Sequence, residues 1–415
     1  MIIDSRKYNG KCSCGRNHAM ETEMCIVESG CLENLEKYMG EYNLTGFTVA
    51  VYDENTYKAT DGKHPKVHCE VILTPENLHA NEHGVDLLAE KLPQNTEVLI
   101  AIGSGTVHDL VRYCAYERKI DFVSCPTAAS VDGFCSSVAA MTWHGCKKTL
   151  TAVAPKIVVA DIDVIKNAPI RLSKSGFGDM IGKYVALTDW KISNILTGEF
   201  YCDSISNMTY EATQKIENSI DGILSAQPSA YENLMYGLLM SGLAMQMFEN
   251  SRPASGAEHH ISHIIEMSPK GLGVCSDALH GEKVGVGTLI AIEEYRRMAT
   301  LDNVSFCDYT KFDEKTIMEI FGNDQASEIV KENMKDAAEK VTAELLKTHW
   351  DEILVQIQKM PDIIKLRETY LKYGIKAFLC DIGVDDSKKT ELMDCSPMVR
   401  NRLTLMRLRK CLKEA

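Results

Sequence analysis

The chain has 415 residues, 45% of them hydrophobic and 25% charged, which suits a globular protein long enough for two domains. Its formal net charge of −13 argues against nucleic-acid binding, which needs a basic face. No apolar run reaches the ~18 residues of a membrane span, and residues 1–8 lack the apolar core of a signal peptide, so we expect a cytoplasmic protein with mostly reduced, buried cysteines.

Residues 33–165 alternate between short apolar segments and amphipathic segments. Such alternation predicts a Rossmann-like α/β domain over 1–166, with a parallel sheet covered by helices on both faces. The predicted strands are Phe47–Tyr52, His68–Leu73, Glu97–Ile102, Asp121–Ser124 and Ile157–Ala160. The predicted helices are Glu33–Tyr42, Glu82–Lys91 and Thr106–Glu117. A β-hairpin is predicted from Val138–Thr142 and Thr149–Val153, with Gly145 in its turn.

Strand signals nearly vanish after residue 166, which predicts an all-α domain over 167–415. Its predicted helices are Gly178–Ile195, Tyr210–Leu224, Ala230–Glu249, Ala257–Met267 and Gly281–Arg297. The stretch Glu314–Lys410 reads as helical, with breaks near Pro361, Gly383 and Pro397.

The stretch Gly103–Asp109 (GSGTVHD) follows a predicted strand and opens a helix. Glycines let a backbone approach a pyrophosphate, and a helix N-terminus offers N–H groups and a positive dipole. The alternative is a tight strand-to-helix turn, because the third glycine of the full fingerprint is absent. Asp53, at the end of a strand, suits an adenosine ribose and favours NAD over NADP, although it is equally a turn former.

A loop dense in hydroxyl groups, Pro126–Ser137, follows the next predicted strand at its carboxyl end, where open α/β sheets bind ligands. Hydroxyls at 127, 130 and 136 can donate to ligand oxygens, and Asp132 can accept from a substrate hydroxyl. A Ser/Thr-rich loop that caps a helix is the alternative interpretation.

Histidines gather between residues 259 and 280. His259 and His263 lie one helical turn apart, and His280 follows a loop and opens the next helix. With Asp179 from the stretch Lys174–Asp179, at the expected start of the helical domain's first helix, His259 and His280 complete three ligands with an open position, as in a catalytic metal site. Buried structural imidazoles and plain helix capping by Asp179 are the alternatives.

A second group, Cys12, Cys14 and His18, lies near the N-terminus. Two thiols and an imidazole within seven residues can bind a metal, although a structural zinc site usually needs a fourth ligand. Cys25 and Cys31 are only loose candidates for it. A polar N-terminal turn with spare cysteines is the competing interpretation.

Five motifs together resemble the superfamily of metal-dependent alcohol dehydrogenases that includes glycerol dehydrogenase and dehydroquinate synthase, and within it the bacterial sn-glycerol-1-phosphate dehydrogenases. They are Gly103–Asp109, Pro126–Asp132, Gly176–Asp179, Gly256–His259 with Ser262–His263, and His280–Lys283. The family often has a third consecutive glycine where this chain has Ser104, and serine still permits a close backbone approach.

The resemblance implies a dehydroquinate synthase-like architecture and a role for each matched residue. Those implied to bind NAD(H), with NADP(H) as an alternative, are Asp53, Gly103, Ser104, Gly105, Thr106, Val107, Asp109, Thr127, Ser130 and Ser136. Asp132, Asp179 and His263 would contact substrate. Asp179, His259 and His280 would bind one divalent metal, with zinc expected and nickel or iron(II) as alternatives. The catalytic group would be Asp179, His259, His263 and His280.

The resemblance further implies reversible, metal-dependent reduction of dihydroxyacetone phosphate to sn-glycerol 1-phosphate for glycerophospholipid synthesis. Its hydride would come from NADH, and its proton from metal-bound water or His263. Glycerol dehydrogenase, a dehydroquinate-synthase-like lyase and an NAD-sensing protein without catalysis are the alternatives. The expected partners are a phosphorylated triose and a second copy of the chain in a homodimer, with no nucleic acid.

Overall fold

The computed structural model describes residues 1–302 and 304–414, which fall into two compact units. We call the first the sheet unit, and it comprises residues 1–143, 147–180 and 207–251. The second, the helical unit, comprises residues 144–146, 181–206 and the described chain from 252 onward. Each unit is therefore assembled from three stretches of sequence. The division near residue 166 that the sequence suggests stays a prediction.

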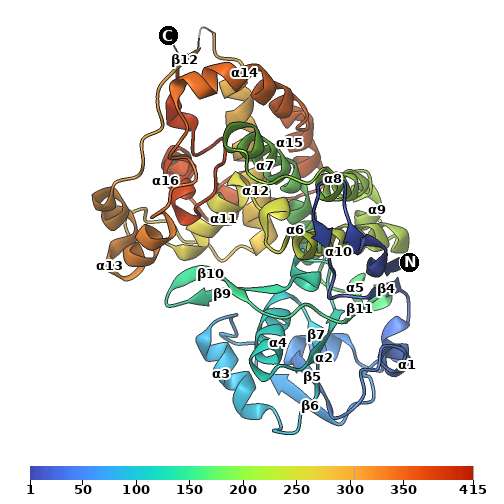
Figure 1. Cartoon of the computed structure of the whole chain (residues 1–415). Coiled ribbons are helices and arrows are strands. Elements are labelled where there is room, and N and C mark those ends of the chain that lie inside the picture. Colours follow the sequence, from blue (N-terminus) through green and yellow to red (C-terminus); the bar gives the residue numbers. More distant parts are fainter. Residues whose placement is uncertain (303, 415) are drawn as a thin grey trace. The chain divides into compact units, whose positions relative to one another are not determined.

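A seven-stranded sheet forms the centre of the sheet unit (Figure 1). Its order is β1 (Ile2–Asp4), β4 (Met24–Glu28), β11 (Ile157–Asp161), β8 (Asp121–Pro126), β7 (Val98–Gly103), β5 (Thr48–Asp53) and β6 (Cys69–Leu73). Only β1 runs antiparallel to its neighbour, which confirms the predicted parallel α/β architecture. The sequence reasoning missed β1 and β4.

Both faces of this sheet are buried, because alternate residues of the central strands face opposite cores. Val49, Val51, Leu99 and Ala101 pack with α3 (Glu82–Lys91) and α4 (Gly105–Arg118). Ala50, Tyr52, Ile100 and Ile102 belong to a second core with Leu35 and Met39 of α1 (Leu35–Glu41). The short α2 (Glu54–Ala59) and α5 (Ile162–Ile165) follow β5 and β11 directly.

The long helix α10 (Pro228–Phe248) also belongs to the sheet unit, and it packs against β4 and the 3-10 turn Gly133–Cys135. It buries its methionines, as expected for helix packing. The amide of Gln246 donates to Thr22 Oγ1 at 2.7 Å, which attaches this helix to the N-terminal segment. The sequence predicted Ala230–Glu249 here, and the prediction is confirmed within two residues.

The prediction of one helix from Gly178 to Ile195 is wrong at its start. The structure has α6 (Ile170–Ile181) directly after Pro169, then α7 (Lys183–Thr197). Gly176 therefore lies inside α6 rather than before a helix. A Cβ on Gly176 would lie 2.1 Å from the carbonyl oxygen of Ala129, so the glycine allows α6 to approach the loop after β8. The sequence reasoning mistook this packing glycine for a helix-start signal.

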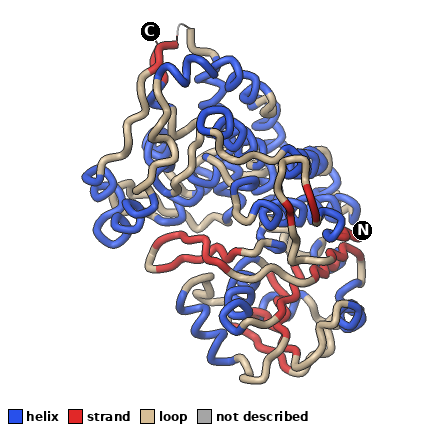
Figure 2. The backbone as a smooth tube through the Cα atoms, viewed as in Figure 1, coloured by secondary structure: helices blue, strands red, loops and turns tan. Residues whose placement is uncertain are grey.

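Helices joined by loops are the main regular elements of the helical unit (Figure 2). They are α7, α11 (Ala257–Met267), α12 (His280–Ala299), α13 (Glu314–Glu332), α14 (Ala343–Gln358), α15 (Ile363–Lys372) and α16 (Lys389–Cys395). Two short strands, β12 (Val304–Phe306) and β13 (Leu412–Glu414), pair antiparallel. The prediction of helix to Lys410 is wrong, because α16 ends at Cys395 and a coiled segment with short 3-10 turns follows.

The structure also contains a predicted helix in two parts and the predicted hairpin. The predicted helix Tyr210–Leu224 is two helices, α8 (Asp203–Glu217) and α9 (Ile220–Leu224). The predicted hairpin is present as β9 (Val138–Trp143) and β10 (Cys146–Thr151).

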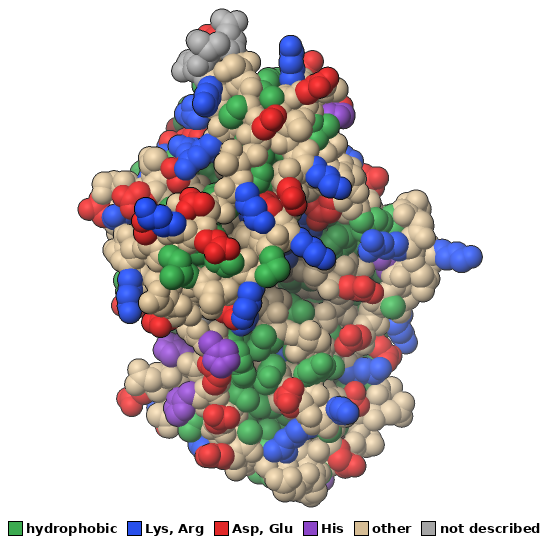
Figure 3. Space-filling view, turned by 60° about the vertical axis from the view of Figure 1, so that its left-hand side comes forward, with side chains coloured by type: hydrophobic (Ala, Val, Ile, Leu, Met, Phe, Trp, Pro, Cys, Tyr) green, Lys and Arg blue, Asp and Glu red, His purple; other side chains and the backbone are tan. Residues whose placement is uncertain are grey.

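Among the described residues, no helix combines the length and apolar character that a membrane span requires. Acidic and basic side chains are intermixed on the face drawn in Figure 3.

Candidate active site

The stretch Gly103–Asp109 forms the turn from β7 into α4, where the sequence places a phosphate-binding loop. Ser104 is the residue before α4, and its side chain makes no capping hydrogen bond, so the first N–H groups of the helix stay available to an anion. A Cβ on Gly103 would lie 2.7 Å from the Cβ of Val107, so no side chain fits there. Gly105, Thr106 and Val107 form the first turn of α4.

Buried groups beneath this loop hold it in shape. His108 Nδ1 donates to the carbonyl of Ser104 at 2.9 Å, and burial lowers the pKa of His108 to about 3, which keeps it neutral. Arg112 is fully buried and donates to the carbonyl of Val138 at 2.8 Å and to two carbonyls of the turn Gly133–Cys135. Its guanidinium lies 3.8 Å from Asp109 Oδ1. The sequence reasoning did not identify Arg112.

The hydroxyl-rich loop lies at the same edge of the sheet. Gly103 and Pro126 pair at the carboxyl ends of β7 and β8, and the Thr127 N–H donates to the Gly103 carbonyl at 2.9 Å. Thr127, Ser130 and Ser136 are all buried. The two stretches predicted to bind the cofactor are therefore adjacent within the sheet unit, whereas their cofactor contacts stay predictions.

Asp132 and Asp179 are linked within the sheet unit. The Asp132 N–H donates to Asp179 Oδ2 at 3.0 Å, and the Ser241 hydroxyl donates to the Asp132 carboxylate at 2.8 Å. Ser175 of α6 also donates to the carbonyl of Ser130 at 3.3 Å. Asp179, which is fully buried near the end of α6, is thus oriented by the loop after β8. Ser241, on α10, was not identified from the sequence.

Asp53 has a local structural role. Its carboxylate accepts the Thr56 N–H at 2.8 Å, and the Thr56 hydroxyl accepts the Asp53 N–H at 3.0 Å, a reciprocal cap on α2. This arrangement supports the alternative in which Asp53 shapes the turn. Its contact with a ribose stays a prediction.

The three histidines of the central motif gather within the helical unit. Ring centroids lie 5.4 Å apart for His259 and His280, and 6.0 Å apart for His263 and each of the other two. Ligand nitrogens of His259 and His280 lie within 4.8 Å of each other. Nδ1 of His263 is buried with no hydrogen-bond partner among the described residues. His260, on the same helix, is fully buried outside these ring contacts.

Two carboxylates fix the tautomers of the outer histidines. His259 Nδ1 lies 2.6 Å from Glu258 Oε1, and His280 Nδ1 lies 2.8 Å from Glu266 Oε1. A carboxylate only accepts, so each Nδ1 carries the proton and each Nε2 presents a lone pair. This donor set fits a divalent metal ion, because neutral imidazole binds through that lone pair. Glu266 lies seven residues after His259, a helical spacing that could have revealed it.

Cations border the histidines in the helical unit. Lys283 Nζ lies 3.5 Å from Glu266 Oε1, beside the carboxylate that holds His280. Burial and then the charge of Arg400 lower the pKa of His263 well below its ordinary value. Two other cations of the helical unit, Lys183 and Arg252, contact other groups. Lys183 donates to the Ala254 carbonyl at 3.1 Å, and Arg252 pairs with Glu199 at 3.0 Å, so both have structural contacts.

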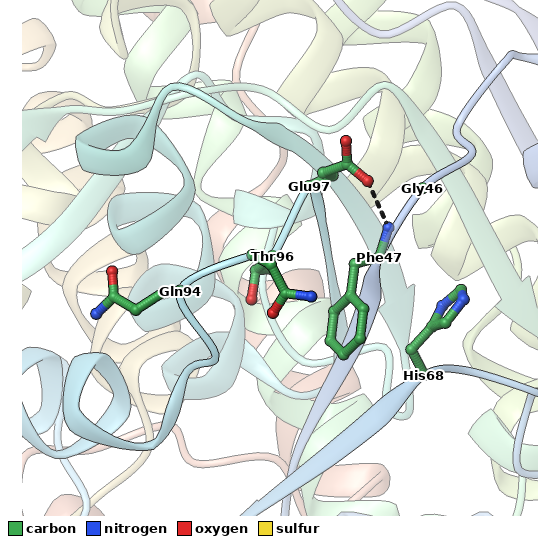
Figure 4. Close-up of a pocket in the computed structure, with 7 residues that line it drawn as sticks. Gly46, Phe47, His68, Gln94, Thr96 and Glu97 are labelled. Atoms are coloured by element: carbon green, nitrogen blue, oxygen red, sulfur yellow. Dashed lines mark hydrogen bonds between the residues drawn. The ribbon is translucent and has the colours of Figure 1, made fainter.

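The pocket of about 740 Å³ drawn in Figure 4 lies elsewhere in the sheet unit. Its lining includes Phe47, His68 and Glu97, which directly precede β5, β6 and β7. The Phe47 N–H donates to Glu97 Oε2 at 2.7 Å, the dashed line in that view. The strands are parallel, so this pocket lies at the edge opposite Gly103, away from the predicted phosphate loop.

The sequence of this chain is similar to those of known dehydrogenases. Residues 26–169 match the model of the iron-containing alcohol dehydrogenases. The chain is 37% identical over 310 residues to the glycerol-1-phosphate dehydrogenase (NAD(P)+) of Bacillus licheniformis, covering 72% of this chain and 77% of that protein. It is 30% identical to the protein of the same name from Halalkalibacterium halodurans, covering 100% and 98%.

A solved structure shows the same fold at low sequence identity. The iron-containing alcohol dehydrogenase of Corynebacterium glutamicum superposes with a TM-score of 0.61 at 15% identity, covering 95% of each chain. Together with the full-length match above, this similarity confirms the resemblance that the five motifs suggest. The chain therefore belongs to the glycerol-1-phosphate dehydrogenase family, among the iron-containing alcohol dehydrogenases.

Proposed function

We propose that this protein catalyses the reversible, NAD(P)-dependent reduction of dihydroxyacetone phosphate to sn-glycerol 1-phosphate, a building block for glycerophospholipids. The observation that carries the proposal is the pair His259 and His280, because a carboxylate holds the Nδ1 of each ring and so directs its lone pair to Nε2. A nicotinamide cofactor would place its pyrophosphate at the start of α4, where N–H groups of the first turn are available. Relatives named for this reaction with NAD(P)+ support the cofactor class.

We propose Asp179, His259 and His280 as the ligands of one divalent metal ion, zinc in the first instance. Asp179 belongs to the sheet unit, and both histidines belong to the helical unit. The chain crosses between the units one residue after Asp179 and remains helical through Gly182 into α7. When bound, the cation would polarise the ketone and stabilise the charge that develops on its oxygen.

The protein's own groups then have separate tasks. Thr127, Ser130 and Ser136 would orient the nicotinamide against the substrate, since all are buried beside the loop that begins at Gly103. Asp132, fixed by Ser241, would accept from a substrate hydroxyl. His263 would bind substrate through its buried Nδ1 and would relay a proton from solvent to the new alcohol, because its lowered pKa keeps the ring neutral between transfers.

We further propose that Arg400 binds the substrate phosphate. Its charge acts directly on His263, and its carbonyl is held by Arg407 Nη1 at 3.1 Å, which fixes the segment that carries it. Guanidinium groups suit phosphate because they donate two parallel hydrogen bonds. A cation beside the proposed substrate histidine favours a phosphorylated ketone over a neutral one.

The test of the proposed function is NADH oxidation with dihydroxyacetone phosphate and, separately, with unphosphorylated dihydroxyacetone. We expect turnover only with the phosphate ester, loss of activity after chelation, and recovery when a divalent metal is added. Equal or faster turnover of the unphosphorylated ketone would assign the protein as a glycerol dehydrogenase. Lack of turnover with either ketone, despite bound metal and NAD, would remove the dehydrogenase proposal.

Replacing Arg400 with glutamine should affect the reduction of dihydroxyacetone phosphate but not that of unphosphorylated dihydroxyacetone. A charge-assisted hydrogen bond contributes about 1.5–3 kcal/mol, so the KM for dihydroxyacetone phosphate should rise roughly 10- to 150-fold. Any slow reduction of unphosphorylated dihydroxyacetone should keep its rate. Arg297→Gln is the matched control, because Arg297 is an exposed arginine paired with Glu294 on α12. Equal losses with both ketones would instead indicate general damage to the site.

A further inference from the structure

A small hairpin near the N-terminus lies outside the machinery described above. β2 (Gly10–Lys11) pairs antiparallel with β3 (Asn17–His18), and the Cys12 N–H donates to the Arg16 carbonyl at 2.9 Å across the turn. Gly15 closes the turn at φ +87°, a conformation that favours glycine, and its N–H donates to the Cys12 carbonyl at 3.0 Å. The fold thereby brings together the ligand atoms of Cys12, Cys14 and His18, within 4.8 Å of one another.

The histidine of this hairpin is oriented by a contact far along the chain. His18 is 3% exposed, and its Nδ1 lies 2.9 Å from the carbonyl oxygen of Met247 on α10. A carbonyl accepts and never donates, so Nδ1 carries the proton and Nε2 presents its lone pair. That Nε2 lies 3.3 Å from the Sγ of Cys14. A backbone carbonyl that fixes the tautomer of a histidine is the usual outer contact of a metal ligand.

We propose that Cys12, Cys14 and His18 bind a structural zinc ion, and that Cys202 is its fourth ligand. Three sulfurs and one imidazole nitrogen make a closed tetrahedral set, which selects zinc and leaves no position for substrate. Cys202 is a fully buried thiol. It directly precedes α8, the helix on which the chain returns to the sheet unit between residues 206 and 207.

Binding would deprotonate the three thiols and release their protons to solvent, so affinity should fall at acidic pH. The ion would secure the first twenty residues to α10, where Gln246 already accepts the N–H groups of Glu21 and Thr22 at 3.1 and 3.3 Å. Its role would be structural rather than catalytic. Nothing in this proposal depends on the reaction that the protein catalyses.

Cobalt substitution of the reduced, full-length protein tests the proposal. Thiolate ligands give Co²⁺ an intense charge-transfer band in the near ultraviolet, whereas the proposed Asp/His/His site contains no thiolate. We expect the band in the wild type, in His259→Ala and in the control Cys275→Ser, whose cysteine is exposed. We expect the band to disappear in Cys14→Ser. The zinc-loaded form of this variant should also contain about one equivalent of zinc per chain less than the wild type, as measured by mass spectrometry.

Each part of the proposal has a result that would contradict it. A wild-type protein without the band, or an unchanged band in Cys14→Ser, would overturn the site. An unchanged band in Cys202→Ser would overturn the assignment of the fourth ligand. Failure of the dehydrogenase assay with the band intact would affect only the proposed function. Circular dichroism and NADH binding verify that each variant is folded, and His18→Cys, which keeps a soft ligand, should retain the band.

Discussion

Replacing His259 with alanine should lower kcat/KM for dihydroxyacetone phosphate by roughly a thousandfold. Polarisation of a carbonyl by a bound cation contributes several kcal/mol to the transition state, and each 1.4 kcal/mol is a factor of ten. The variant loses one of the two imidazoles that we propose as metal ligands, each held by a carboxylate on its Nδ1. Steady-state NADH oxidation and the metal content of the purified variant measure both consequences.

The adjacent residue provides a matched control. His260 is on the same helix and fully buried, yet both of its ring nitrogens lack hydrogen-bond partners among the described residues. His260→Leu should therefore retain metal and most of the activity. Glu258→Gln, which weakens the hold on His259 without removing a ligand, should lower metal affinity by about 10- to 100-fold. Equal activity in His259→Ala and the wild type would exclude His259 as a ligand.

The largest loss of stability is expected for Arg407→Met. The guanidinium of Arg407 and the carboxylate of Asp336 are both fully buried and lie 2.9 Å apart. Arg407 also donates to Asn333 Oδ1 at 2.6 Å and to the Pro397 carbonyl at 2.7 Å. Removing one partner strands a buried charge, so the free energy of unfolding should fall by about 3–5 kcal/mol in urea titrations.

A control variant, a double variant and the pH dependence of stability test the reason given for the effect of Arg407→Met. Arg297→Met breaks an ion pair whose arginine is 53% exposed, so its effect should stay within about 1 kcal/mol. The double variant Arg407→Met/Asp336→Leu should regain part of the stability, because neither charge is then stranded. Burial opposes the ionisation of Asp336, but Arg407 outweighs it and holds the pKa below its ordinary value. The wild-type advantage should therefore be complete at neutral pH and shrink below about pH 4.

The strands of the sheet centre were predictable because they are largely apolar, as is typical of strands buried on both faces. The two neighbouring strands at one side of the sheet, β1 and β4, give weaker sequence signals. β1 is three residues long, and β4 (MCIVE) ends in half-buried residues on both sides. Such a segment becomes a strand only when a neighbouring strand forms backbone hydrogen bonds with it. The tertiary structure decides whether that neighbour is present.

His259 and His263 could be found from their helical spacing, and His280 from its position after a loop at the start of the next helix. Their carboxylate partners were missed, because acidic residues next to histidines on a helix look like ordinary solvated charges. Glu266 contacts His280, fourteen residues later, only because α11 and α12 pack together. Arg400 was missed for a similar reason. It follows the turn Ser396–Val399, which packs against α11 and shows no motif in the sequence.

The interleaved path of the chain also has a consequence for its synthesis. All seven strands of the sheet have left the ribosome once residue 161 has emerged, but α10, which covers β4 and the turn Gly133–Cys135, comes only with residues 228–248. Part of the sheet of a nascent chain must therefore stay uncovered while α5 to α9 are translated. In this state chaperones protect exposed apolar surface. His18, among the first residues made, cannot reach the carbonyl of Met247 until that interval ends.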